Sequence, residues 1–316
     1  MKYKVIFCGT PNIAVDVLKG LEKIDIEIVG VITQPDKFIG RKKEIKFSEV
    51  KQYSLEKKYK ILQPIKIKDS YEEIKNLKAD FLVTCAFGQF IPQNILDLFK
   101  NCINVHGSIL PKYRGGSPIQ YAIMNGDKQT GVTLMKMIKQ MDAGEIYVTE
   151  KIDILDTDDS GSLFLKMGSL ANKMIEKYLI DIFENKIQGV KQDETKASFA
   201  YNLSNQEEKI DWSKSNVEII NFIKSQSPSP IAFTFLNNER IKIKKARLIK
   251  EDEIFISLMK IFVPGEIINL DNEGIIVQTG DGILKVLELQ RAGKKMGSAG
   301  LYNFSNSPFL PTSMFK

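Results

Sequence analysis

Short apolar runs alternate with amphipathic segments along the first 190 residues, and this rhythm constrains the fold more than any other feature of the chain. The runs include KVIFCG, DIEIVGVITQ, ADFLVTCAFG and CINVHGS, and segments such as AVDVLKGLEKI lie between them. An apolar run of strand length followed by a helical pattern, repeated several times, is typical of βαβ units. The sequence therefore predicts an α/β domain over residues 1–190, with a Rossmann-like, mostly parallel sheet and helices on both faces.

The rest of the chain has a different pattern. Residues 191–208 are polar and are typical of a linker. From 209 to 316 the apolar runs are short, alternating and interrupted by Gly, Pro and Asn, which favours a smaller C-terminal β-barrel of the OB-like type. A chain of 316 residues with 43% hydrophobic residues is sufficient for a core in each of two domains.

Composition argues against several classes of protein. The three cysteines are far apart in apolar stretches, which favours free thiols in a reducing compartment, so we expect a cytoplasmic protein. A single histidine and the lack of a Cys-x-x-Cys pair argue against a metal site, and no apolar stretch is long enough for a signal peptide or a membrane span. The net charge of +6 permits a nucleic acid as a partner without requiring one.

Two common nucleotide-binding motifs are missing from the sequence. The first expected strand-to-helix turn, FCGTPNIA, has Gly9 alone where a dinucleotide-binding turn needs Gly-x-Gly-x-x-Gly. The Gly-x-x-x-x-Gly-Lys-Ser/Thr pattern of a phosphate loop is also missing. The sequence therefore gives little support to a nicotinamide enzyme or to a nucleotide hydrolase.

The only histidine, His106, lies where the apolar run CINVHGS passes into a loop rich in Gly and Pro. Ligands of open parallel sheets bind at the carboxyl ends of the strands, and strand alternation places Asn104 and His106 on the same face. A lone histidine is more often structural than catalytic. The neighbouring amide and the glycine-rich loop instead favour a site that polarises a carbonyl group and admits a planar ligand.

Asp142, in the segment KQMDAGEIY, is the carboxylate that we expect beside this histidine. Taken alone, the Asp-Ala-Gly stretch is more typical of a turn-forming aspartate. A carboxylate at this place would also orient His106 and hold it protonated.

The segments VIFCGTP, CINVHGSILPKYRGGSPIQ and GVTLMKMIKQMDAGEIY resemble those of the folate-dependent formyltransferases. The loop TQPDKFIGRKK and the C-terminal segments IDWS and PGEII are most similar to the branch of this family that acts on tRNA. The resemblance implies transfer of a formyl group from 10-formyltetrahydrofolate to the α-amino group of methionyl-initiator tRNA, without a metal. Asn104 and His106 would then stabilise a tetrahedral oxyanion, and Asp142 would support His106 and assist proton movement.

The resemblance also implies which residues bind the formyl donor. Four of them follow the histidine closely: Ser108, Ile109, Leu110 and Pro111. The apolar loop CAFGQFIP, which contains Phe87 and Gly88, would form another wall of the folate pocket.

Two basic segments are the expected tRNA contacts, and we expect the enzyme to act as a monomer. The loop QPDKFIGRKKEIKF contains Arg41, Lys42 and Lys43, and it resembles the family loop that enters the tRNA acceptor stem. In ERIKIKK, Lys242 and Lys244 alternate with isoleucines, as in a strand with one basic face. A basic loop is more often only solvated charge, and a strand of this pattern can equally be a solvated edge strand.

Departures from the family pattern fall in the expected tRNA-binding parts. Lys42 stands where the family often has glycine, and Ser229 stands where an aromatic residue is often found. Three alternatives remain at this stage: a relative that formylates glycinamide ribonucleotide, a relative that formylates a UDP-linked aminosugar, and a non-catalytic RNA-binding protein. The second domain argues against the first, the tRNA-branch segments argue against the second, and the complete set of Asn104, His106 and Asp142 argues against the third.

We expect Arg41→Ala to reduce formylation of initiator tRNA severely, and more than Lys43→Ala does, because a forked guanidinium makes more directional contacts than an ammonium. Transfer to a small acceptor without the stem should be nearly unchanged in both variants. Parallel assays with the two acceptors measure this difference. Equal damage to both acceptors by Arg41→Ala would show that the loop does not bind tRNA.

Overall fold

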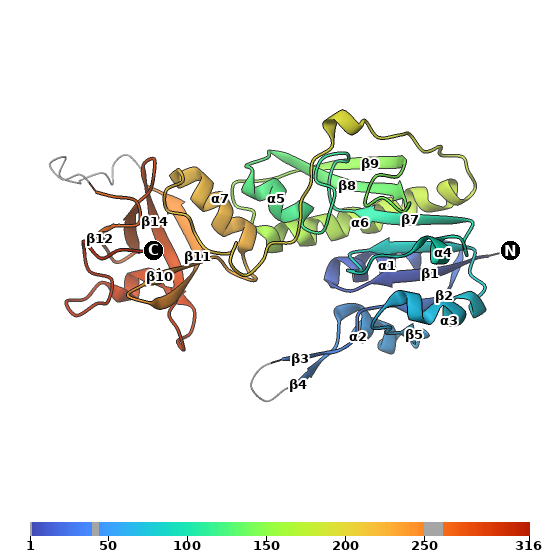
Figure 1. Cartoon of the computed structure of the whole chain (residues 1–316), viewed down its shortest axis with the longest axis horizontal. Coiled ribbons are helices and arrows are strands. Elements are labelled where there is room, and N and C mark those ends of the chain that lie inside the picture. The colour runs from blue at the N-terminus through green and yellow to red at the C-terminus, as the bar shows by residue number, and fades with distance from the viewer. Residues whose placement is uncertain (1, 40–43, 250–261) are drawn as a thin grey trace. The chain divides into compact units, whose positions relative to one another are not determined.

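The computed structural model describes residues 2–39, 44–249 and 262–316 (Figure 1). The chain divides into two compact units, each assembled from more than one stretch of sequence. The first consists of Met1–Pro118, Gln129–Asp153 and Phe164–Tyr201. The second consists of Ile119–Lys128, Ile154–Leu163 and Asn202–Lys316.

A seven-stranded sheet in the order β5-β2-β1-β6-β7-β8-β9 forms the first unit's centre (Figure 1). The parallel strands are β5 (Ile61–Leu62), β2 (Ile26–Ile32), β1 (Tyr3–Gly9), β6 (Phe81–Cys85) and β7 (Asn101–His106). Two antiparallel strands, β8 (Gln129–Lys136) and β9 (Ile146–Asp153), complete the sheet. The predicted α/β class with a mostly parallel sheet is confirmed.

Five helices lie between strands of this sheet along the chain, and a sixth follows its last strand. The five are α1 (Asn12–Leu21), α2 (Glu49–Glu56), α3 (Tyr71–Asn76), α4 (Gln93–Leu96) and α5 (Pro118–Met124), and α6 (Ser160–Phe183) comes after β9. The face of α1 that carries Val17, Leu18 and Leu21 is fully buried. In β1 the run from Val5 to Cys8 is also fully buried, as expected for a parallel strand covered on both faces.

The second unit contains an antiparallel sheet in the order β10-β11-β14-β13-β12, with β15 paired to β14. Its strands are β10 (Phe233–Leu236), β11 (Glu239–Leu248), β12 (Ile267–Leu270), β13 (Ile275–Gln278), β14 (Ile283–Gln290) and β15 (Gly297–Ser298). The sheet curls into a half-barrel around a core that includes Trp212, Ile241 and Phe309 (Figure 1). Helix α7 (Asn216–Gln226) adds Ile219 and Ile223 to this core, and the small β-domain expected at the C-terminus is confirmed.

The three cysteines are buried, free thiols. Burial raises the pKa of both Cys85 and Cys102 to about 12, so these two side chains stay protonated and unreactive at neutral pH. Over the described ranges, no helix is long and apolar enough to cross a membrane, and no group of three or more His, Cys, Asp and Glu side chains could hold a metal ion.

We expect Ile103→Ala to lower the free energy of unfolding by about 3 kcal/mol, because Ile103 is fully buried in the middle of β7 and its truncation leaves a cavity. The control Ile103→Val removes one methylene group and should cost about 1 kcal/mol. Urea unfolding of the two variants measures the difference. Equal losses would mean that this strand is not packed as described.

Candidate active site

The site begins at the carboxyl end of β7, where Asn104 and His106 lie on the same face of the strand. β6 pairs with β7 so that Thr84 lies opposite Asn104, and the Thr84 hydroxyl donates to Oδ1 of Asn104 at 2.8 Å. This bond orients the amide group, because Oδ1 is then turned toward β6 and Nδ2 toward the opposite side. Nδ2 donates to Oδ1 of Asp142 at 3.3 Å.

His106 is buried, with 5% of its surface exposed, and both ring nitrogens have neighbours. Nε2 lies 2.8 Å from the carbonyl oxygen of Tyr113, which only accepts, so Nε2 carries a hydrogen. Nδ1 lies 3.6 Å from Oδ2 of Asp142. The ring therefore presents Nδ1 to the carboxylate.

Asp142 lies in a tight turn before β9 and adopts a left-handed conformation with φ of 50°. Its Oδ2 accepts from the backbone N–H of Gly115 at 2.8 Å, and the side chain is only 15% exposed. The turn packs closely against β8, since a Cβ on Gly144 would lie 1.9 Å from the carbonyl oxygen of Lys136. Backbone geometry thus directs the carboxylate toward the end of β7.

Arg114 and Gln192 form a second layer around this turn that the sequence analysis did not identify. The amide of Gln192 donates to the carbonyl oxygens of Asp142 and Gly144, both at 2.8 Å. The Arg114 side chain is 1% exposed and donates from Nη2 to Gln192 at 2.8 Å and to Glu194 at 2.7 Å. The hydrogen bond from Arg114 lowers the pKa of the Glu194 carboxyl. The only signal in the sequence was an arginine in the loop after His106 and a polar segment expected to be a linker.

The residues expected to bind folate lie in loops at the carboxyl ends of β6 and β7. The carbonyl oxygen of Phe87 accepts from Thr10 Oγ1 and from Gln34 Nε2, both at 3.0 Å, and Gly88 follows with φ of 81°. In the next loop Ser108 donates to the carbonyl oxygen of Lys112 at 2.5 Å. The remaining three residues are buried or half-buried: Ile109, Leu110 and Pro111.

The residues expected to bind tRNA fall into two groups, one around Arg41 and one in the second unit. Arg41, Lys42 and Lys43 lie outside the described residues, between β3 (Lys37–Ile39) and β4 (Glu44–Lys46). These two strands form an antiparallel hairpin that exposes Phe38 and Ile45.

The C-terminal lysines lie on β11, whose alternation is as expected because Ile241 and Ile243 are fully buried. β11 lies between β10 and β14, so the alternative of an edge strand is wrong. Lys242 donates to the carbonyl oxygen of Pro230 at 3.2 Å, and Lys244 is paired with Glu288 at 3.0 Å.

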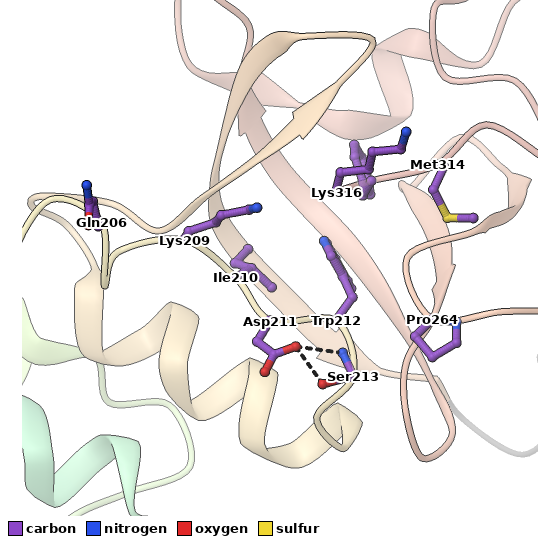
Figure 2. A pocket seen from close by; sticks show the side chains of 10 residues that line it. Gln206, Lys209, Ile210, Asp211, Trp212, Ser213, Pro264, Met314 and Lys316 are labelled. Carbon is purple, nitrogen blue, oxygen red and sulfur yellow. Dashed lines mark hydrogen bonds between the residues drawn. The ribbon is translucent and has the colours of Figure 1, made fainter.

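A separate open pocket of about 620 Å³ lies in the second unit, and Figure 2 shows its lining. The ring of Trp212 stacks on Phe315 with centroids 5.4 Å apart, and its Nε1 donates to Thr234 at 2.9 Å. Asp211 accepts two hydrogen bonds from Ser213, which lower the pKa of its carboxyl. The lining contains no histidine and no amide–histidine pair comparable to Asn104 and His106.

Comparison with known proteins matches two family patterns to successive parts of the chain. The family pattern described as "Formyl transferase" matches residues 1–179, and that described as "Formyl transferase, C-terminal domain" matches residues 202–304. The chain is 54% identical to a methionyl-tRNA formyltransferase of Mycoplasma capricolum over 95% of this chain and 94% of the relative. It is 48% identical to the corresponding protein of Mesoplasma florum over 96% of both chains.

Solved structures show a similar fold at lower identity. The N-formyltransferase of Helicobacter canadensis, in complex with folinic acid and dTDP-3-aminofucose, has a TM-score of 0.65 and 22% identity over 92% of this chain and its whole length. HypX of Aquifex aeolicus with tetrahydrofolic acid has a TM-score of 0.62 and 13% identity over 95% of this chain, which spans only 46% of HypX. These neighbours bear on the fold alone. Because relatives near 50% identity match along almost their whole length, the chain belongs to the methionyl-tRNA formyltransferase family.

Proposed function

We propose that Asn104, His106 and Asp142 carry out the reaction of this family in the present chain, and that its acceptor is the initiator form of methionyl-tRNA. As a family member, the enzyme transfers the formyl group of 10-formyltetrahydrofolate to the α-amino group of methionyl-tRNA for translation initiation. One observation supports the assignment of residues best. The carboxylate of Asp142 accepts from Asn104 and faces His106 where β7 ends, at the edge where ligands of such sheets bind.

Asn104 supplies the hydrogen bond that stabilises developing charge. Attack of the amine on the formyl carbon places negative charge on the formyl oxygen, and a fixed N–H donor lowers the energy of that transition state. One Nδ2 hydrogen donates to Asp142 while Oδ1 accepts from Thr84, which leaves the second Nδ2 hydrogen for the formyl oxygen in this proposal. The amide is therefore preorganised before substrates bind.

His106 and Asp142 move the proton. The attacking amine must lose a proton, and the nitrogen that leaves the formyl group must gain one. The bond from Nε2 to Tyr113 holds the imidazole in place, so Nδ1 exchanges the proton beside the carboxylate. Asp142 thereby orients His106 and offsets its charge when it is protonated.

We infer that the formyl donor binds between the loop with Phe87 and Gly88 and residues 108–111. 10-Formyltetrahydrofolate supplies a formyl carbonyl on a nitrogen that can leave. The loop of Phe87 combines buried apolar side chains with a backbone held by Thr10 and Gln34, and such a wall fits a planar ring that requires both stacking and edge hydrogen bonds.

We further infer that residues 1–190 form the catalytic domain, residues 191–208 a linker and residues 209–316 a tRNA-binding domain. The basic residues expected to contact tRNA remain Arg41, Lys42, Lys43, Lys242 and Lys244. In this proposal the enzyme acts as a monomer in the cytoplasm, where translation uses its product. The alternatives of glycinamide ribonucleotide and aminosugar acceptors lose support, because the relatives near 50% identity are named for methionyl-tRNA.

We expect Asn104→Ala and His106→Ala to lower kcat by a factor on the order of 100 or more, because each removes a group aimed at the reacting atoms. Transfer of labelled formyl from 10-formyltetrahydrofolate to methionyl-initiator tRNA measures the rate. Asn101→Ala is a matched control on the same strand, since Asn101 contacts Tyr147 and lies at the other end of β7. If either active-site variant turns over as fast as the wild type, the assignment of residues is wrong. If the wild-type enzyme prefers methionyl-elongator tRNA to methionyl-initiator tRNA, the choice of acceptor is wrong.

We expect Asp142→Asn to keep the turn, because asparagine tolerates the left-handed backbone and its Oδ1 can still accept from Gly115. Loss of the negative charge beside His106 should lower kcat and change the pH profile of the rate. Steady-state rates across a pH series measure both effects, and thermal unfolding verifies that the fold is intact. An unchanged rate and profile would make Asp142 a turn residue only.

A further inference from the structure

Two aromatic side chains next to the loop that follows His106 are exposed to solvent and have no role in the proposed mechanism. Phe199 and Tyr201 lie near the end of the first unit's last segment, and their rings stack with centroids 5.6 Å apart and an interplanar angle of 2°. Phe199 is 45% exposed and Tyr201 58% exposed, whereas Ala200 between them is fully buried. A parallel pair of exposed rings is a flat apolar surface of the kind on which a planar ligand stacks.

Backbone hydrogen bonds attach this pair to the loop after His106. Arg114 N–H donates to the carbonyl oxygen of Ser198 at 2.8 Å, and Ala200 N–H donates to that of Arg114 at 2.7 Å. Ser117 N–H donates to the carbonyl oxygen of Ala200 at 3.0 Å. Backbone hydrogen bonds therefore hold the segment that carries the aromatic pair against the loop after His106.

Gly115 connects the pair to the catalytic carboxylate. Its N–H donates to Asp142, and a Cβ on Gly115, which has φ of 121°, would lie 2.6 Å from the carbonyl oxygen of Ala200. Only a glycine permits this close approach. Asp142, Gly115 and Ala200 thus form a continuous path of direct contacts from the proposed proton-transfer groups to the two rings.

We propose that Phe199 and Tyr201 form the stacking platform for the terminal adenine of methionyl-tRNA. The inference rests on the proposed function, in which the α-amine of the acceptor lies beside Asp142. Methionine is esterified to the ribose of the terminal adenosine, so only an ester and one sugar separate that amine from the base. The base must therefore lie close to Asp142, and aromatic side chains bind bases by stacking.

The formyl donor is the competing occupant of the platform, because its own rings can also stack. Its expected walls, the loop of Phe87 and residues 108–111, lie at the ends of β6 and β7. Ser198 N–H donates to the carbonyl oxygen of Pro111 at 3.3 Å, whereas Ala200, which lies between the two rings, is bonded to Arg114 and Ser117. This placement favours the acceptor, and the kinetics below distinguish the two.

The first experiment removes both rings and keeps apolar bulk, in the double variant Phe199→Leu/Tyr201→Leu. We expect KM for methionyl-tRNA to rise on the order of tenfold with kcat nearly unchanged, because stacking acts on bound substrate and transition state alike. KM for 10-formyltetrahydrofolate should stay at the wild-type value. The conservative pair Phe199→Tyr/Tyr201→Phe keeps both rings and should behave as wild type.

The second experiment detects the base directly and does not depend on turnover. The only tryptophan, Trp212, is buried in the second unit, so the fluorescence of Tyr201→Trp above the wild-type background reports on the platform. Initiator tRNA with a complete CCA end should quench this signal. The same tRNA without its terminal adenosine should quench it much less, because it lacks the stacking base.

Several outcomes would overturn the platform. Equal quenching by both tRNAs, or an unchanged KM for methionyl-tRNA in the double leucine variant, would exclude a role in binding the base. A raised KM for the folate alone would assign the rings to the donor. A wild-type enzyme that forms no formylmethionyl-tRNA would instead refute the proposed function, while quenching that requires the terminal adenosine would still support the base site.

Discussion

The carboxylate of Asp142 is the group on which the organisation of the proposed site depends. It is largely removed from water, and an ionised group in such a place requires strong hydrogen bonds to offset its lost hydration. Gly115 and Asn104 supply them, and the imidazole of His106 completes the surroundings. The same contacts that stabilise the carboxylate also orient the amide and the ring, so the proposed function depends on the bonds that stabilise this turn.

The buried guanidinium of Arg114 contributes to this arrangement through Gln192, which is hydrogen-bonded both to Arg114 and to the turn of Asp142. The guanidinium of Arg114 would be costly in the interior without partners, and Gln192 and Glu194 provide them. Because Gln192 also binds the turn of Asp142, the segment after residue 190 takes part in the site although its composition is that of a linker. The lowered pKa of Glu194 means that its ion pair with Arg114 is complete at neutral pH and is lost as pH falls through that pKa.

Much of the fold was predictable because periodicity in the sequence reports burial directly. The continuous apolar runs of β1 and β6 mark strands covered on both faces, and the alternation of Ile241 and Ile243 with lysines marks a strand with one buried face. Whether β11 was an edge strand could not be predicted, since strand order depends on pairing between segments far apart in sequence. The pairing of β11 with both β10 and β14 decided it.

The sequence by itself determined the chemical types in the candidate site: one histidine, an amide two residues before it, and an aspartate in a turn 36 residues later. Local spacing is enough for that, because Asn104 and His106 share a face of any strand. Only the tertiary structure decided which nitrogen of His106 faces Asp142, and that Arg114 pairs with Glu194. Those contacts join residues 36 and 80 positions apart in the sequence, and close packing rather than local preference selects them.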